Sequence, residues 1–199
     1  MPFISRMIVS LSLAIRHRRE LRNLLDRTPR DNSILLLDPE ALRQAGVAAL
    51  ALDFDGVLAP HGAPEPLPEA ILWLKRCEAV FPDDRIFILS NKPTDGRCRW
   101  FARHFPAIRF ISGVRKKPYP DGLNRVAELA ALPPWAILMV DDRLLTGCLA
   151  ALIAGALPCY IRSPYISLGN RTVAELFFWL LRAGERGCLR MISLPWGEQ

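Results

Sequence analysis

Apolar runs of strand length alternate with amphipathic runs of helix length through the middle of the chain. Strands that are buried on both faces read as continuous apolar runs, and strands separated by helices pair in parallel. The pattern therefore predicts a doubly wound, parallel five-stranded α/β sheet with right-handed crossovers. The predicted strands cover residues 48–54, 85–90, 108–112, 136–140 and 158–162, and the predicted helices cover residues 67–81, 95–105, 121–132 and 144–156.

Two further segments flank this alternating region. Residues 3–25 are first apolar and then basic, and residues 27–33 have the Pro, Asp, Asn and Ser content of a linker. The amphipathic run 172–192 follows the last strand, and we expect Gly184 and Gly187 to break it. The chain thus divides into a basic amphipathic helix and linker (1–33), an α/β core (34–170) and a C-terminal helical segment (171–199).

Positive charge is concentrated at the N-terminus. Of the formal net charge of +6, residues 1–30 contribute +5, from seven arginines and two acidic residues. A basic end on a nearly neutral domain indicates an anionic partner or a solvated tail. Nucleic acid is not expected, because the arginines are not interleaved with aromatic residues for base stacking. An anionic membrane surface is the partner that we favour.

The apolar run at residues 3–15 decides how the N-terminus would meet a membrane. It is shorter than the ~20 residues of a spanning helix. The basic cluster follows the apolar part, which is the reverse of the order in a signal peptide. An interfacial amphipathic helix is one interpretation, and a helix packed on the domain's own core is the alternative.

The cysteines indicate a reducing compartment. The chain has five of them, an odd number, with no CxxC pair. This usage is typical of reduced thiols in a cytosolic protein rather than of a disulfide framework or a zinc site. We therefore expect a cytoplasmic protein, with peripheral attachment to the membrane as a possibility.

Polar side chains gather at the carboxyl ends of four predicted strands. Open α/β sheets bind their ligands at this edge. We therefore expect these side chains to form one site, although each of them alone also fits a turn, a helix cap or a solvated loop. They are Asp53 and Asp55 after the first strand, Ser90 and Asn91 after the second, Lys117 beyond the third, and Asp141 and Asp142 at the fourth.

Carboxylates that converge on one edge repel one another, and a hard divalent cation with oxygen ligands would offset that cost. This chemistry predicts a Mg²⁺ site. Mg²⁺ and a lysine neutralise phosphoryl oxygens. One carboxylate can then attack phosphorus and form an aspartyl-phosphate, and a second can protonate the leaving oxygen and later activate water.

Four short runs, LALDFDGVL, FILSN, RKKP and MVDDR, resemble the four motifs of the haloacid-dehalogenase-like hydrolases. The resemblance covers roughly residues 34–165. It implies that Asp53 is the nucleophile and Asp55 the acid/base. It further implies that Ser90 and Asn91 bind the phosphoryl group, that Lys117 anchors the charge, and that Asp141 and Asp142 hold Mg²⁺ together with Asp53 and Asp55.

Two longer runs, DPEALRQAGVAALALDFDGVLAP and VDDRLLTGCLAALIAGALPCYI, are similar to the YqeG-type subclass IIIA branch of that superfamily. The branch includes the phosphatidylglycerophosphate phosphatases. Its fourth motif usually reads Gly-Asp-Gln-x-x-Thr-Asp, whereas this chain has Asp141 at the glycine and Gly147 at the final aspartate. Gly56 and Val57 also stand where the branch usually has Asn-Thr. The resemblance implies a Mg²⁺-dependent phosphomonoester phosphatase acting on a lipid such as phosphatidylglycerophosphate.

Two alternatives stay open at this point. The same chemistry can serve a soluble phosphorylated metabolite, either a sugar or a nucleotide phosphate. A chain with an altered fourth motif can also be a weakly active scaffold that binds membrane through residues 1–30. The intervals between the motifs leave room for one helix, or one helix and one strand, so no cap domain is expected. An open site suits a bulky substrate such as a lipid head group.

Three residues outside the motifs carry smaller expectations. Phe177, Phe178 and Trp179 are expected to pack on the sheet rather than to add membrane contact. His61 follows the first motif closely and is expected to lie in a surface loop.

Overall fold

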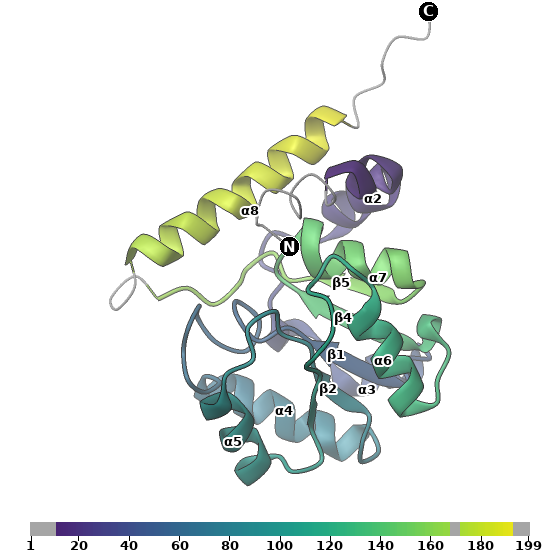
Figure 1. Cartoon of the computed structure of the whole chain (residues 1–199), viewed down its shortest axis with the longest axis vertical. Helices are drawn as coiled ribbons and strands as arrows, with labels where there is room; N and C mark the ends of the chain where they lie inside the picture. Colours follow the sequence, from purple (N-terminus) through teal and green to yellow (C-terminus); the bar gives the residue numbers. More distant parts are fainter. Residues whose placement is uncertain (1–10, 168–171, 193–199) are drawn as a thin grey trace, which may run out of the picture.

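The computed structural model describes residues 11–167 and 172–192. Its centre is an all-parallel five-stranded sheet with the order β3-β2-β1-β4-β5, and Figure 1 shows helices packed on both sides of it. The predicted fold class is therefore confirmed. The strands are β1 (Ala49–Leu52), β2 (Ile86–Ile88), β3 (Arg109–Phe110), β4 (Ile137–Asp141) and β5 (Leu157–Tyr160), most of them shorter than the apolar runs that predict them.

The helices lie close to their predicted positions. Residues 11–16 are also helical, and residues 49–160 contain no inserted domain. Short 3₁₀ helices cover Ile34–Leu36 and Pro134–Ala136, and a π-helix at Leu144–Cys148 precedes α7. The α-helices are α2 (Arg18–Arg27), α3 (Pro39–Gln44), α4 (Pro68–Val80), α5 (Asp95–His104), α6 (Asp121–Ala130), α7 (Leu149–Ala154) and α8 (Thr172–Ile192).

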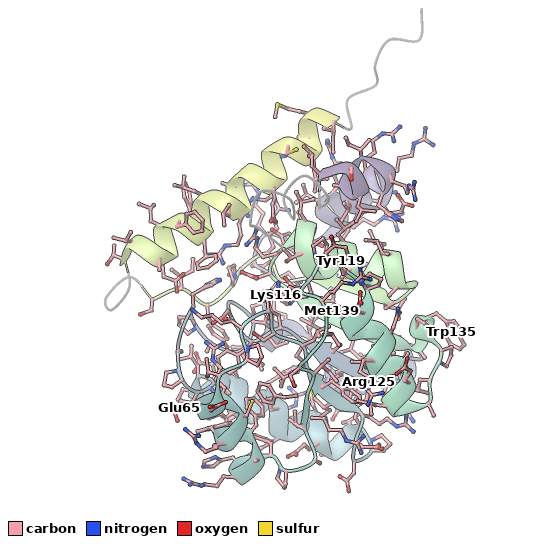
Figure 2. All side chains as sticks on the ribbon, viewed as in Figure 1. Glu65, Lys116, Tyr119, Arg125, Trp135 and Met139 are labelled. Carbon is pink, nitrogen blue, oxygen red and sulfur yellow. The ribbon has the colours of Figure 1, made fainter. Side chains whose placement is uncertain are left out.

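The sheet separates two apolar layers. Successive side chains of a strand point to opposite faces. Leu50 and Leu52 therefore pack with α4 and α5, whereas Ala49 and Ala51 pack with α6 and α7. Met139 of β4, labelled in Figure 2, lies fully buried in the second layer. The helices on both faces leave the carboxyl edge of the strands as the place where polar groups can meet.

A third apolar cluster joins the two ends of the chain to the β5 side of the sheet. Leu21 and Leu25 of α2 pack with Leu149, Tyr160 and Leu189, and Figure 1 shows α2 beside α8 at this end of the molecule. For residues 11–27, the helix packed on the domain's own core is therefore the correct alternative. The remaining part of the apolar run, residues 1–10, lies outside the described residues.

Helix α8 runs without interruption over 21 residues. The expectation that Gly184 and Gly187 break it is wrong. Each glycine costs a helix only about 1 kcal/mol relative to alanine, and packing along the buried side of α8 outweighs that cost. Within the described ranges, the structure has no helix long and apolar enough to cross a membrane.

Candidate active site

Three aspartates meet at the carboxyl edge of the sheet. Asp53 directly follows β1, and its amide donates a hydrogen bond to the carbonyl of Val140 at 2.9 Å. Asp141 is the last residue of β4, and Asp142 comes next. Carboxylate oxygens of the three aspartates lie within 4.8 Å of one another. This carboxylate cluster, Asp53, Asp141 and Asp142, can hold a metal ion.

Lys117 bridges two members of the carboxylate cluster. Its Nζ lies 3.0 Å from Asp53 Oδ2 and 2.5 Å from Asp141 Oδ2, with the side chain almost fully buried. Burial works to lower the pKa of Lys117, but Asp141 and Asp53 raise it above its ordinary value. The lysine is therefore a permanent cation. Asn91 holds the loop that carries it, because Asn91 Oδ1 accepts a hydrogen bond from the Lys117 amide at 2.8 Å.

The carboxylate cluster carries more negative charge than its neighbours offset. Burial, together with Asp141, raises the pKa of Asp142 to about 7. Burial likewise raises the pKa of Asp53 well above its ordinary value, against the opposing effect of Lys117. Among the described residues, the three carboxylates form ion pairs with two cations, Lys117 and Arg182. A divalent cation would let all three ionise.

One oxygen of the cluster is poised as a ligand. Asp142 Oδ2 accepts a hydrogen bond from Arg182 Nη1 at 2.5 Å, whereas Asp142 Oδ1 is buried and has no hydrogen-bond partner. A buried carboxylate oxygen without a partner is costly unless something binds it. The oxygen donors and the unpartnered Oδ1 therefore fit a hard cation.

Asp55 lies outside the carboxylate cluster. Arg97 of α5 donates to it twice, at 2.7 and 3.1 Å, and the Gly62 amide donates at 2.9 Å. Burial works to raise the pKa of Asp55, but these hydrogen bonds, led by those from Arg97, hold it below its ordinary value. Asp55 is thus ionised and can accept a proton. No sequence motif pointed to Arg97.

A hollow of about 140 Å³ lies beside the lysine. Its lining includes Ser90, Asn91 and the loop from Arg115 to Lys117. Ser90 is buried, and its Oγ accepts a hydrogen bond from the Lys92 amide at 3.2 Å. Lys116, labelled in Figure 2, is exposed in the lining loop. The basic lining suits an anionic group.

Helix α8 contributes charged residues to the edge of the site. Arg182 is 2% exposed and binds Asp142, and its Nη2 lies 4.0 Å from Glu175. Glu185 accepts a hydrogen bond from Arg143 Nε at 2.7 Å and a second from the Leu144 amide at 3.1 Å. Glu175, Arg182 and Glu185 stand in none of the sequence motifs. The available signal was that Glu175, Arg182 and Glu185 recur at helical spacing in a largely apolar run.

The aromatic residues of α8 do not all behave as expected. Phe178 stacks on His61, with ring centroids 3.7 Å apart. His61 is therefore not a surface loop residue, and burial lowers its pKa to about 4. Phe177 and Trp179 are each 49% exposed, so the expectation that they pack on the sheet is wrong. The helix turns them outward because its buried face is set by Glu175 and Arg182.

Two glycines make room for the carboxylate cluster. A Cβ at Gly147 would overlap the Asp141 carboxylate, and a Cβ at Gly56, where φ is +82°, would overlap the Asp142 carboxylate. A side chain at position 147 would thus compete for the place that the Asp141 carboxylate occupies. The Asp141 carboxylate can occupy this place because Gly147 has no side chain, so the two positions depend on each other.

This arrangement predicts a stability difference between two glycine-to-alanine variants. Gly147→Ala should lower the free energy of unfolding by about 1–3 kcal/mol, because the added methyl group overpacks the buried site. Gly184→Ala, in α8, meets open space and should raise it by about 0.5–1 kcal/mol. Urea unfolding measures both. Equal stability of the two variants would contradict the overlap at Asp141.

Comparisons with known proteins give the following. No family model matches the chain, and none of the curated proteins does. A similar solved structure is that of an uncharacterized protein from Corynebacterium glutamicum, which is 21% identical to this chain. The match covers 69% of this chain and 96% of that chain, with a TM-score of 0.42.

Proposed function

We propose that this protein is a Mg²⁺-dependent phosphomonoester phosphatase of the haloacid-dehalogenase-like class that works through an aspartyl-phosphate. The observation that carries the proposal is the carboxylate cluster bridged by Lys117 beside a basic hollow. The same residues supply the motifs by which the sequence resembles this class. Their assembly at one edge of a parallel sheet supports the resemblance with geometry.

Each residue has a role that follows from its surroundings. Asp53 attacks phosphorus, because it is the least buried member of the cluster. Lys117 is a fixed cation beside it and offsets the charge of the phosphoryl oxygens. Asp141 and Asp142 would hold Mg²⁺ together with Asp53, with the unpartnered Oδ1 of Asp142 as one ligand. The bound Mg²⁺ would supply charge neutralisation for the transferred group.

Asp55 is the proposed acid/base. As it stands, it is an ionised carboxylate held by Arg97 and can activate water for the second step. Protonating the leaving oxygen in the first step requires that Asp55 carry a proton. We therefore infer that substrate binding must loosen the Asp55–Arg97 ion pair. Ser90 lines the hollow, and Asn91 acts through Lys117 by fixing its loop.

The preferred substrate is a lipid phosphomonoester such as phosphatidylglycerophosphate. The absence of an inserted domain from residues 49–160 and the exposed basic residues of the N-terminal helix support a bulky anionic substrate at a membrane. Comparing hydrolysis of phosphatidylglycerophosphate in vesicles with that of soluble sugar and nucleotide phosphates tests this. Faster turnover of a soluble phosphate would favour a metabolite phosphatase, and no hydrolysis of any substrate would favour a binding scaffold.

Metal binding should show a defined dependence on pH. The folded-state pKa of Asp142, about 7, lies above its ordinary value of 3.8. The metal-free protein should therefore lose stability as pH rises from about 4 to about 7, where the unfolded chain ionises before the buried carboxyl does. Bound Mg²⁺ neutralises the ionised Asp142 carboxylate and so offsets this loss of stability. At high pH, protons no longer compete with Mg²⁺ for that carboxylate. We expect Mg²⁺ to raise the melting temperature more at about pH 8 than at about pH 5.

The control for this experiment is the Asp142→Asn variant, which keeps the shape of the side chain but cannot ionise. It should lose most of the Mg²⁺-induced rise. An increase in melting temperature that is the same at both pH values, or the same in the variant, would argue against a cation at the carboxylate cluster.

A further inference from the structure

Helix α8 buries three charged residues and exposes most of its large apolar residues. Its buried residues are Glu175, Arg182, Glu185 and Leu189. A surface helix ordinarily does the opposite, with an apolar face on the core and a polar face in water. We call the exposed apolar side the outer stripe of α8. It consists of Val173, Leu176, Phe177, Trp179, Leu180 and Met191, which are 49–84% exposed.

Helical spacing places most of the outer stripe on one side of α8. Val173, Leu176, Phe177 and Leu180 follow the i, i+3, i+4, i+7 pattern. Gly184 continues this side, and a Cβ there would meet nothing within 4 Å. Contiguous exposed apolar surface of this kind marks a contact site rather than scattered surface residues.

Positive charge lies on α2, which packs beside the C-terminal part of α8. Helix α2 packs against α8 through Leu21, Leu25 and Leu189, so its opposite side faces solvent. That side and the residues just before it carry the exposed Arg16, Arg19 and Arg27, which we call the arginine face, together with the exposed Glu20 and Asp26. Positive charge still prevails, because residues 16–30 hold six arginines and these two acidic residues. Figure 2 shows nitrogen-tipped side chains extending from α2 away from the body of the protein.

We propose that the outer stripe of α8 and the arginine face together dock on an anionic phospholipid bilayer. A bilayer surface offers an apolar interior for Phe177 and Leu180 and anionic head groups for the arginines. A second copy of this chain packed along the outer stripe would satisfy the apolar residues alone. It would leave the arginine face without an anionic partner.

The docking surface also fixes where the site meets the membrane. The inner side of α8 binds Asp142 through Arg182 at 2.5 Å, and an α-helix with its side chains is about 10 Å across. A bilayer on the outer stripe therefore lies about one helix diameter from the carboxylate cluster. The docked position would let a lipid phosphomonoester reach Asp53 without leaving its membrane. For the identity of the substrate, this inference rests on the proposed function.

Vesicle co-sedimentation of the full chain tests the docking without using hydrolysis, so its outcome is independent of the proposed activity. The probe is vesicles of phosphatidylcholine mixed with phosphatidylglycerol. The unchanged protein should bind them, with affinity falling as salt rises. Phe177→Ser/Leu180→Ser should weaken binding at least ~10-fold. Arg16→Gln/Arg19→Gln should weaken it roughly 20- to 30-fold, because each charge near anionic lipid contributes about fivefold.

Matched variants on the remote side of the molecule serve as controls. Trp135→Ser removes an aromatic side chain that is 66% exposed, and Arg99→Gln/Arg103→Gln removes two exposed arginines of α5. Both should bind vesicles as the unchanged protein does, and circular dichroism checks that every variant is folded. Vesicle binding that survives Phe177→Ser/Leu180→Ser would overturn the proposal. A dimer in sedimentation that this variant dissolves, without any vesicle binding, would assign the outer stripe to a second copy and also overturn it.

Discussion

Asp53→Asn is expected to reduce Mg²⁺-dependent hydrolysis of an aryl phosphate on the order of 10⁴-fold or more, because an amide cannot form the aspartyl-phosphate. The substitution keeps the shape of the side chain. It also leaves the ion pair of Lys117 with Asp141 in place, at 2.5 Å. The protein should therefore stay folded while it loses activity. Initial rates with p-nitrophenyl phosphate measure the effect, and thermal melting verifies the fold.

Asp84→Asn is the matched control for this experiment. Asp84 lies on the surface, pairs with Arg85 and Arg109, and has a φ of +69°, a backbone conformation that asparagine also tolerates. Activity should not change. An Asp53→Asn protein as active as the Asp84→Asn protein would rule out Asp53 as the nucleophile, and with it the proposed function.

Arg182→Met is expected to lower the free energy of unfolding by about 3–5 kcal/mol in metal-free buffer at neutral pH. The methionine fills a similar volume, but it leaves Asp142 and Glu175 buried without their cation. Both carboxylates are 1% exposed, so water cannot replace the arginine. Urea unfolding measures the loss. Added Mg²⁺ should recover part of it, because the cation neutralises Asp142.

Arg190→Met on the exposed side of the same helix separates this effect from any change in helix propensity. It should alter stability by no more than about 0.5 kcal/mol. If Arg182→Met were as mild as Arg190→Met, the ion pair with Asp142 would not hold α8 on the site, and the inverted polarity of the helix would need another explanation.

The fold could be predicted from the sequence because each strand and helix has its own local pattern of apolar and polar residues. Each buried strand appears in the sequence as an apolar run, such as residues 85–90 around β2. Each crossover helix appears as an amphipathic run. Strand ends were less accessible. Leu52 ends β1 two residues before the apolar pattern does, because ladder hydrogen bonds with the neighbouring strands, and not hydropathy, define where a strand stops.

Only the site residues that come after strands of the core could be predicted from the sequence. Asp53, Lys117 and Asp141 meet as the topology requires. Arg97 and Arg182 were missed because their partners are 42 and 40 residues away along the chain. No local sequence pattern predicts which buried carboxylate an arginine on a helix will pair with. The same holds for α8, whose glycines suggested a break that packing against the core prevents.

A Cβ at position 147 would overlap the Asp141 carboxylate, so the residue at one of these positions limits what the other can accept. A lineage that carried aspartate at both positions would crowd two carboxylates into one space, since a Cβ at 147 already overlaps Asp141. A lineage with glycine at both would lose a ligand. Neither single replacement is therefore a neutral step, and the two positions should covary among homologues, with one acidic and the other glycine. Exchanging the two residues, as Asp141→Gly/Gly147→Asp, should then be tolerated better than either single replacement.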